Sequence, residues 1–191
     1  MTENISATSK SAPPVTQGAS PDATYRHILM VTGARTWSDE TLVTTTFSAV
    51  WKHWFEADGI GAREKGETLL VVGGNPRGAD AIAERLWRDR GLPVLTFLAQ
   101  WDQHGKAAGF LRNQAMVDYL CAQRDGHGAR VTIAAFLALC TKMSCPQSDR
   151  EQLLSSSLPG HFSHGTIDAL RRAGTAGIPS TWAVDPRLPP F

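Results

Sequence analysis

Five short apolar runs alternate with segments whose apolar residues recur at helical spacing, and this alternation limits the folds open to the chain. The runs cover residues 25–32, 68–72, 93–98, 131–137 and 181–184. The helical segments between them cover residues 40–57, 79–90, 111–121 and 166–173. A strand that is apolar along its length must be covered on both faces, as parallel sheets require. The pattern therefore predicts an α/β fold with a mostly parallel sheet of about five strands.

The length of 191 residues suits one domain of this kind. We expect a single Rossmann-like three-layer domain over residues 25–185. Residues 1–24 are rich in Ser, Thr, Ala and Pro and are predicted to be a disordered tail. An irregular insertion is expected at 141–163, and a short C-terminal tail at 186–191.

Charge and cysteine content narrow the class of protein. The net charge of +1 gives no sign of a nucleic-acid surface, and no apolar run approaches the roughly 18 residues that span a membrane. The N-terminal segment lacks the basic start and apolar stretch of a secretory signal. Three cysteines, an odd number, do not form a disulfide framework. These features predict a cytoplasmic protein without a membrane partner.

Four loops rich in Gly and polar residues, at 32–36, 73–80, 105–113 and 163–166, are expected at the C-terminal edge of the sheet. Ligands of open α/β sheets bind at that edge. Glycines there let backbone N–H groups approach an anion, and basic side chains hold it. Each loop alone also fits an ordinary turn with solvated arginines, but four together favour a binding site. The candidate ligand-binding residues are Gly33, Arg35, Thr36, Gly73, Gly74, Arg77, Gly78, Asp80, Lys106, Arg112, Asn113, Gly165 and Thr166.

Neither G-x-G-x-x-G nor G-x-x-x-x-G-K-[ST] occurs in these loops, which argues against a plain NAD or P-loop site. The loops do contain, in order, V-T-G-A-R-T-W, V-G-G-N-P-R-G-A-D-A-I-A, W-D-Q-H-G-K-A-A-G-F-L-R-N-Q-A-M-V, S-H-G-T and A-G-I-P. From about residue 28 to 184 the chain thereby resembles the YspA/YpsA-related branch of the SLOG superfamily.

The resemblance implies a Rossmann-like fold that binds nucleotides or nucleotide-derived molecules. Relatives include Lonely Guy phosphoribohydrolases, ligand sensors of phage defence and nucleotide signalling, and the DNA-processing protein DprA. The loop residues that match the family's motifs are its implied binding residues: Gly33, Arg35, Gly74, Arg77, Asp80, Lys106, Arg112, Asn113, Gly165 and Thr166.

One position departs from the Lonely Guy pattern P-G-G-x-G-T-x-x-E, whose Glu serves catalysis. The counterpart here is F-S-H-G-T-I-D-A, with Ala169 in place of the Glu. Asp168 is adjacent, but neighbouring helical side chains point about 100° apart. Asp80 or Asp168 is the candidate catalytic carboxylate if the protein cleaves an N-glycosidic or ribosyl bond.

The expected function is therefore binding of a nucleotide-derived phosphate ligand, by a sensor or a processing protein. The alternatives are a phosphoribohydrolase-type enzyme, a DprA-like module for single-stranded nucleic acid, and an interaction protein. Among these, the near-neutral charge disfavours nucleic acid.

The insertion supplies a pattern C-x4-C and H-x2-H, formed by Cys140, Cys145, His161 and His164. Two thiolates and two imidazoles are a complete tetrahedral zinc set, and a metal would close a loop that has few large apolar groups. The alternative is a metal-free lid in which Cys140 ends a buried strand. No cofactor other than this structural zinc is expected.

Two tryptophans, Trp37 and Trp101, fall on the predicted ligand-side loops, where a ring stacks on a base or packs a lid. Trp51, Trp54 and Trp87 fall on helices and are assigned to the core or to a homo-oligomer face.

Overall fold

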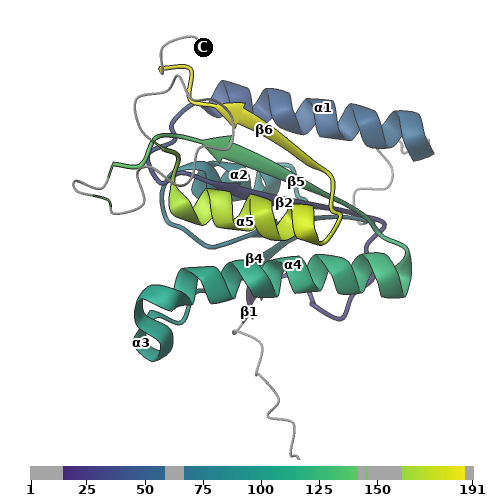
Figure 1. Cartoon of the computed structure of the whole chain (residues 1–191). Helices are drawn as coiled ribbons and strands as arrows, with labels where there is room; N and C mark the ends of the chain where they lie inside the picture. Colours follow the sequence, from purple (N-terminus) through teal and green to yellow (C-terminus); the bar gives the residue numbers. More distant parts are fainter. Residues whose placement is uncertain (1–14, 59–66, 142–144, 146–160, 188–191) are drawn as a thin grey trace, which may run out of the picture.

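The computed structural model describes residues 15–58, 67–141, 145 and 161–187, and these contain a six-stranded sheet (Figure 1). The strand order is β1-β4-β3-β2-β5-β6. The strands are β1 (Val15–Gly18), β2 (His27–Gly33), β3 (Thr68–Val72), β4 (Val94–Phe97), β5 (Arg130–Leu137) and β6 (Ser180–Val184). Strands β2 to β6 pair in parallel with one another, and β1 pairs antiparallel with β4 at the sheet edge. The five-stranded parallel sheet confirms the predicted Rossmann-like fold class.

Helices cover both faces of this sheet. They are α1 (Glu40–Asp58), α2 (Ala79–Arg88), α3 (Trp101–His104), the 3₁₀ turn η2 (Gly105–Ala107), α4 (Ala108–His127) and α5 (His164–Thr175). The side chain of Asp39 caps α1 by accepting the backbone N–H of Leu42 at 2.8 Å. Gly128, in a left-handed conformation, ends α4. None of the helices in the described ranges is long and apolar enough to cross a membrane.

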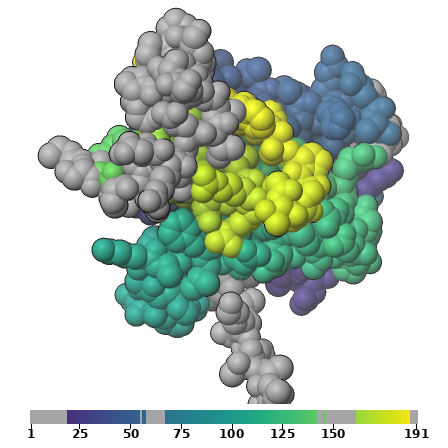
Figure 2. All heavy atoms as spheres, in the orientation of Figure 1, coloured from purple at the N-terminus to yellow at the C-terminus, as the bar shows by residue number. Residues whose placement is uncertain are grey.

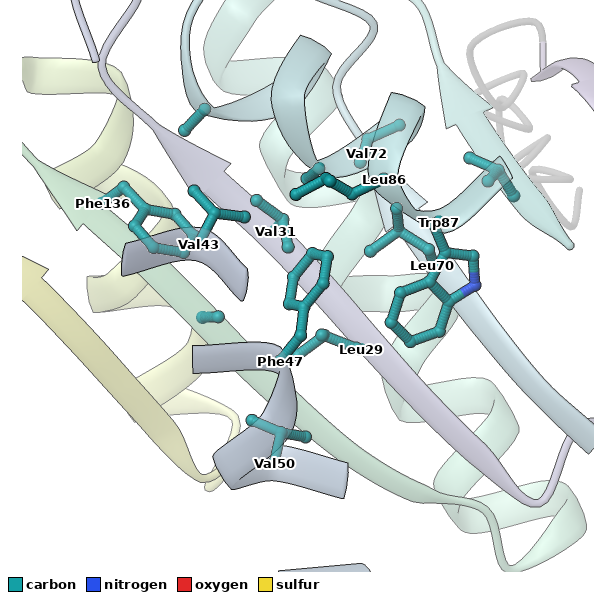
Figure 3. Packing of buried hydrophobic residues seen from close by; sticks show 14 of the residues in the cluster. Leu29, Val31, Val43, Phe47, Val50, Leu70, Val72, Leu86, Trp87 and Phe136 are labelled. Atoms are coloured by element: carbon teal, nitrogen blue, oxygen red, sulfur yellow. The ribbon is translucent and has the colours of Figure 1, made fainter. Parts of the chain in front are cut away.

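Alternate side chains of the central strands pack into two separate hydrophobic cores, one on each face of the sheet. On one face, Leu29 and Val31 of β2 pack with Phe47 of α1 and Trp87 of α2 (Figure 3). On the other face, Met30 packs with residues of α4 and α5, which lie side by side (Figure 2). This alternation is the period-two geometry of a strand that is buried on both sides.

The order of the strands reverses between β2 and β5. From β2 the chain moves outward to β3 and β4, and it then returns to place β5 on the other side of β2. In open α/β sheets the ligand crevice lies at such a switch point, beyond the C-terminal strand ends. The loops after β2, β3 and β5 therefore frame the candidate site.

Two segments differ from their predicted structure. Residues 15–18, expected within a disordered tail, form β1 by backbone pairing with β4. The sequence Val-Thr-Gln-Gly carries no strand signal of its own, and an available sheet edge supplies the hydrogen bonds. Helix α4 is longer than the predicted 111–121, because its start and end pack on α3 and α5. Most of the predicted insertion at 141–163 lies outside the described residues.

Candidate functional site

A hollow of about 350 Å³ opens where the loops after β2 and β3 meet the start of α3. The residues that line it are Arg35, Asn75, Pro76, Arg77 and Trp101. No Asp or Glu is among these lining residues. The guanidinium of Arg35 lies 6.0 Å from the centre of the Trp101 ring, which is 49% exposed. The hollow thus combines two cationic side chains with an accessible aromatic face.

The two loops approach each other through backbone contacts. Ala34 accepts the N–H of Ala79, the first residue of α2, and its own N–H donates to Phe136 of β5. Gly78 has φ 76° and ψ −153°, a conformation that is essentially restricted to glycine. A Cβ at this position would lie 2.2 Å from the carbonyl oxygen of Ala34. Glycine at this position therefore allows the two arginine-bearing loops to converge.

Asp80 is buried and is not among the residues that line the hollow. Its side chain is 4% exposed, and it accepts hydrogen bonds from the backbone of Gly73 and Asn75. Burial raises the pKa of this carboxyl to about 6, against the opposing effect of the Arg112 charge and these two hydrogen bonds. Asp80 thereby anchors the loop that carries Asn75 and Arg77.

A chain of hydrogen bonds joins the remaining polar candidates. Arg112 donates to the carbonyl of Gly73 at 2.8 Å and to Oδ1 of Asn113 at 3.0 Å. Asn113, which is 1% exposed, donates from Nδ2 to the carbonyl of Gly165 and to Asp168, each at 2.9 Å. Asp168 also accepts from Arg172 at 2.9 Å. These polar groups contact one another and the backbone, beside the hollow.

The thirteen predicted ligand-binding residues thus occupy three kinds of place. Arg35 and Arg77 line the hollow, whereas Lys106 is exposed on η2 and does not line it. Thr166 is buried and its hydroxyl lies 2.6 Å from that of Ser163. Glycines and buried polar groups shape the surrounding backbone.

Sequence reasoning did not select Asn75 and Pro76, which line the hollow. The Asn-Pro pair that follows Gly73-Gly74 predicts a turn. A turn alone does not indicate that its residues contact a ligand.

The two loop tryptophans have different roles. Trp37 is 3% exposed, and its ring packs on Phe136 with centroids 5.1 Å apart. The base-stacking interpretation therefore does not hold for Trp37, which belongs to the core. Of the three helix tryptophans that were assigned to the core or to an oligomer face, Trp54 and Trp87 are buried in the core, and Trp51 is partly buried against it.

The four predicted metal ligands come together at the end of β5. Residues 138–140 pair antiparallel with 161–163 through the bridge between Leu139 and Phe162, which places Cys140 opposite His161. One ligand atom from each of Cys140, Cys145, His161 and His164 lies within 4.8 Å of all the others. Nε2 of His164 lies 3.0 Å from Sγ of Cys145 and 2.8 Å from Nε2 of His161. This Cys2His2 cluster can hold a metal ion.

Comparison with known proteins matches the part of the chain that carries the hollow. Residues 27–104 match the model of the YspA, cpYpsA-related SLOG family. Over this segment the chain is similar to the SLOG family. The segment runs from β2 to α3 and therefore contains every residue that lines the hollow. The Cys2His2 cluster lies outside the matched segment.

The chain is also similar to a curated phage protein. Over 94 residues the chain is 42% identical to the "Gene 61 protein" of Mycobacterium phage D29. This similarity covers 47% of the present chain and 66% of the phage protein, just under two thirds of its length.

Gly78→Ala should destabilise the SLOG segment strongly. The new Cβ would clash with the Ala34 carbonyl, and the positive φ disfavours any side chain, so we expect a loss of about 3 kcal/mol or more. Gly91→Ala is the matched control, because Gly91 has φ +69° and nothing within 4 Å of a built Cβ. It should cost about 1 kcal/mol. Urea denaturation measures both, and equal losses would contradict the proposed close approach.

Asp80 should make stability depend on pH between about 4 and 6. The folded protein keeps the Asp80 proton up to about pH 6, whereas the ordinary value is 3.8. Its stabilising contribution is therefore full below pH 4 and is lost as the pH rises through 6. The unfolding free energy of wild type minus that of Asp80→Asn should fall by on the order of 3 kcal/mol from pH 4 to pH 7. A difference that is flat or rises with pH would contradict the raised pKa.

Proposed function

We propose that the hollow at the switch point binds a nucleotide or nucleotide-derived phosphate ligand, and that the protein acts as a sensor or processing protein for it. The observation that carries the proposal is the lining itself: Arg35, Arg77 and Trp101 face one space without an acidic residue among the lining residues. Arginine matches the geometry of phosphate oxygens, and an exposed indole offers a stacking surface for a base. The volume of about 350 Å³ is within the usual range of small-molecule sites.

The loop after β3 adds backbone polarity to this lining. It ends at Gly78, directly before α2, so the N-terminal end of a ten-residue helix adjoins the loop that carries Arg77. Such helix starts favour phosphate because their N–H groups point outward. In this proposal Arg35 and Arg77 supply the charge around the phosphate, and Gly73, Gly74 and Gly78 keep the backbone close. Thr36 and Lys106 are not among the residues that line the hollow.

An N-glycosidic hydrolase is the alternative function, and the raised pKa of Asp80 favours it, since a carboxyl that titrates near 6 can exchange a proton close to neutral pH. Asp168 is the second candidate carboxylate. Ala169, which stands at the position of the Lonely Guy glutamate, is fully buried and offers no such group. Asp80 is also buried and does not line the hollow. Binding without cleavage is therefore the better supported function.

We also propose that the Cys2His2 cluster holds a structural zinc ion. Tetrahedral zinc with bonds of about 2.0–2.3 Å needs its ligand atoms about 3.3–3.8 Å apart. The four candidate atoms here already lie within 4.8 Å of one another. His161 is buried and the other three ligands are half-buried, so the ion would be largely enclosed. In this role the metal would fasten the end of β5 to the start of α5. A cytoplasmic location and a homo-oligomeric state complete the proposal.

Arg77→Ala should weaken nucleotide binding by about ten- to a hundredfold, the loss expected for a hydrogen bond between charged groups. Small molecules released from the purified wild-type protein, identified by mass spectrometry, give the first ligand class. Thermal shift with nucleoside phosphates and ribose 5-phosphate then ranks affinities. Arg88→Ala is the control, because Arg88 pairs with Glu84 on α2 away from the hollow. No shift with any of these compounds would overturn the proposal, and salt-dependent binding of single-stranded DNA would favour a DprA-like module instead.

Zinc should be present at about one equivalent per chain, as measured by elemental mass spectrometry. Cys145→Ser should remove most of it, because a hydroxyl is a poor substitute for a thiolate ligand. Cys121→Ser is the matched control: Cys121 packs beside the core formed with α4 and should leave the zinc content unchanged. Equal zinc in both variants, or none in the wild type, would contradict the metal site.

A further inference from the structure

We infer that Asn113 and Arg112 are positioning residues that connect the Cys2His2 cluster to the loop after β3, so that metal binding orders the ligand-binding loop. The inference rests on the proposed zinc ion and concerns how the proposed ligand site is shaped. The sequence motifs predicted that both residues contact the ligand. In this inference they instead position the loop through hydrogen bonds.

The first step is the link between the cluster and α5. His164 is both a cluster residue and the first residue of this helix. The N–H groups of Thr166 and Ile167 bond the carbonyl of Ser163, which continues the turn from the cluster into the helix. An ion bound by His161 and His164 would therefore fix the position of the first turn of α5, including Gly165.

The second step is the link from α5 to α4 through one buried amide. Asn113 directs its Nδ2 group to two acceptors of α5, the carbonyl of Gly165 and the carboxylate of Asp168. Its Oδ1 accepts from Arg112. A buried amide needs hydrogen-bond partners, so the position of α5 determines the orientation of the Asn113 side chain. That orientation in turn determines where Oδ1 of Asn113 can accept from the Arg112 guanidinium.

The third step is the link from Arg112 to the loop. The guanidinium donates to the carbonyl of Gly73 and packs on this glycine so closely that a Cβ there would lie 2.6 Å from Cζ. Asp80 holds the N–H side of the same loop, at Gly73 and Asn75. Gly73 is thus clamped between Asp80 and Arg112, directly before Asn75 and Arg77 of the hollow.

These links form one continuous path from the cluster to the hollow, by way of His164, Gly165, Asn113, Arg112 and Gly73. A path of hydrogen bonds by itself does not establish energetic coupling. The coupling has a measurable consequence, because an ion that stabilises one arrangement of α5 must also stabilise the loop arrangement that goes with it.

The test is amide hydrogen exchange of residues 73–77, except Pro76, which has no amide hydrogen, in the full chain, with and without Zn²⁺ and with no nucleotide present. In the wild type, zinc should slow exchange of these amides about tenfold, within the usual range of coupling between sites. In Asn113→Ala the zinc effect on residues 73–77 should vanish, although zinc still binds. Elemental analysis of the same samples reports the bound zinc.

Three variants separate positioning from general destabilisation. Asn113→Asp keeps the acceptor for Arg112 but loses the donors to α5, and Arg112→Lys keeps the charge but loses the forked donor; both should abolish the zinc effect. Gln123→Ala removes another buried amide from α4, distant from the cluster, and should retain it.

The outcomes distinguish the proposals from each other. Bound zinc without slower exchange at 73–77 in the wild type would overturn the inference alone. Absence of bound zinc would overturn both the inference and the metal site. A zinc effect that persists in Asn113→Ala and Arg112→Lys would refute the role of these two residues. None of these results depends on whether a nucleotide binds.

Discussion

The double-sided burial of the central strands is the constraint on which the rest of the structure depends. Residues 28–31 of β2 and 69–72 of β3 have no exposed surface, so every one of their backbone polar groups must be paired within the sheet. Parallel pairing of β2 with both β3 and β5 meets this requirement and brings the C-terminal ends of three strands to one edge. The convergence of the polar loops is a direct result.

At that edge, the polar residues divide into those that face the hollow and those that support it. Arg35, Arg77 and Trp101 face the space, whereas Asp80 and Arg112 bond to the backbone of the loop between them. Such a division is physically reasonable, because a flexible glycine-rich loop presents charge in a defined place only if buried groups fix its backbone. The buried pair thereby reduces the entropy that a ligand would otherwise lose in ordering the loop.

The Cys2His2 cluster occupies the other side of the switch point, at the end of β5. It lies beyond the SLOG segment at 27–104, in the part of the chain that the family match does not cover. Short antiparallel pairing at Leu139 and Phe162, supported by a small apolar cluster with Ile167, brings the ligands together. The hollow is lined from the loops after β2 and β3 and from α3, whereas the cluster follows β5, the other neighbour of β2.

Much of this architecture was predictable from the sequence, for a local reason. Apolar runs of strand length, helical spacing and glycines at strand ends are properties of neighbouring residues, and they predicted the parallel sheet and its loops. The spacing of two cysteines and two histidines likewise indicated the Cys2His2 cluster. The tertiary structure alone decided which loop residue faces the hollow. Trp37 and Trp101 follow strands in the same way, yet Trp37 packs on Phe136 of β5 while Trp101 stays exposed. Arg77 and Arg112 both fall in the predicted loops, yet Arg77 lines the hollow whereas Arg112 donates to the carbonyl of Gly73. Burial and partner choice depend on residues far away in the chain, and a local pattern does not contain them.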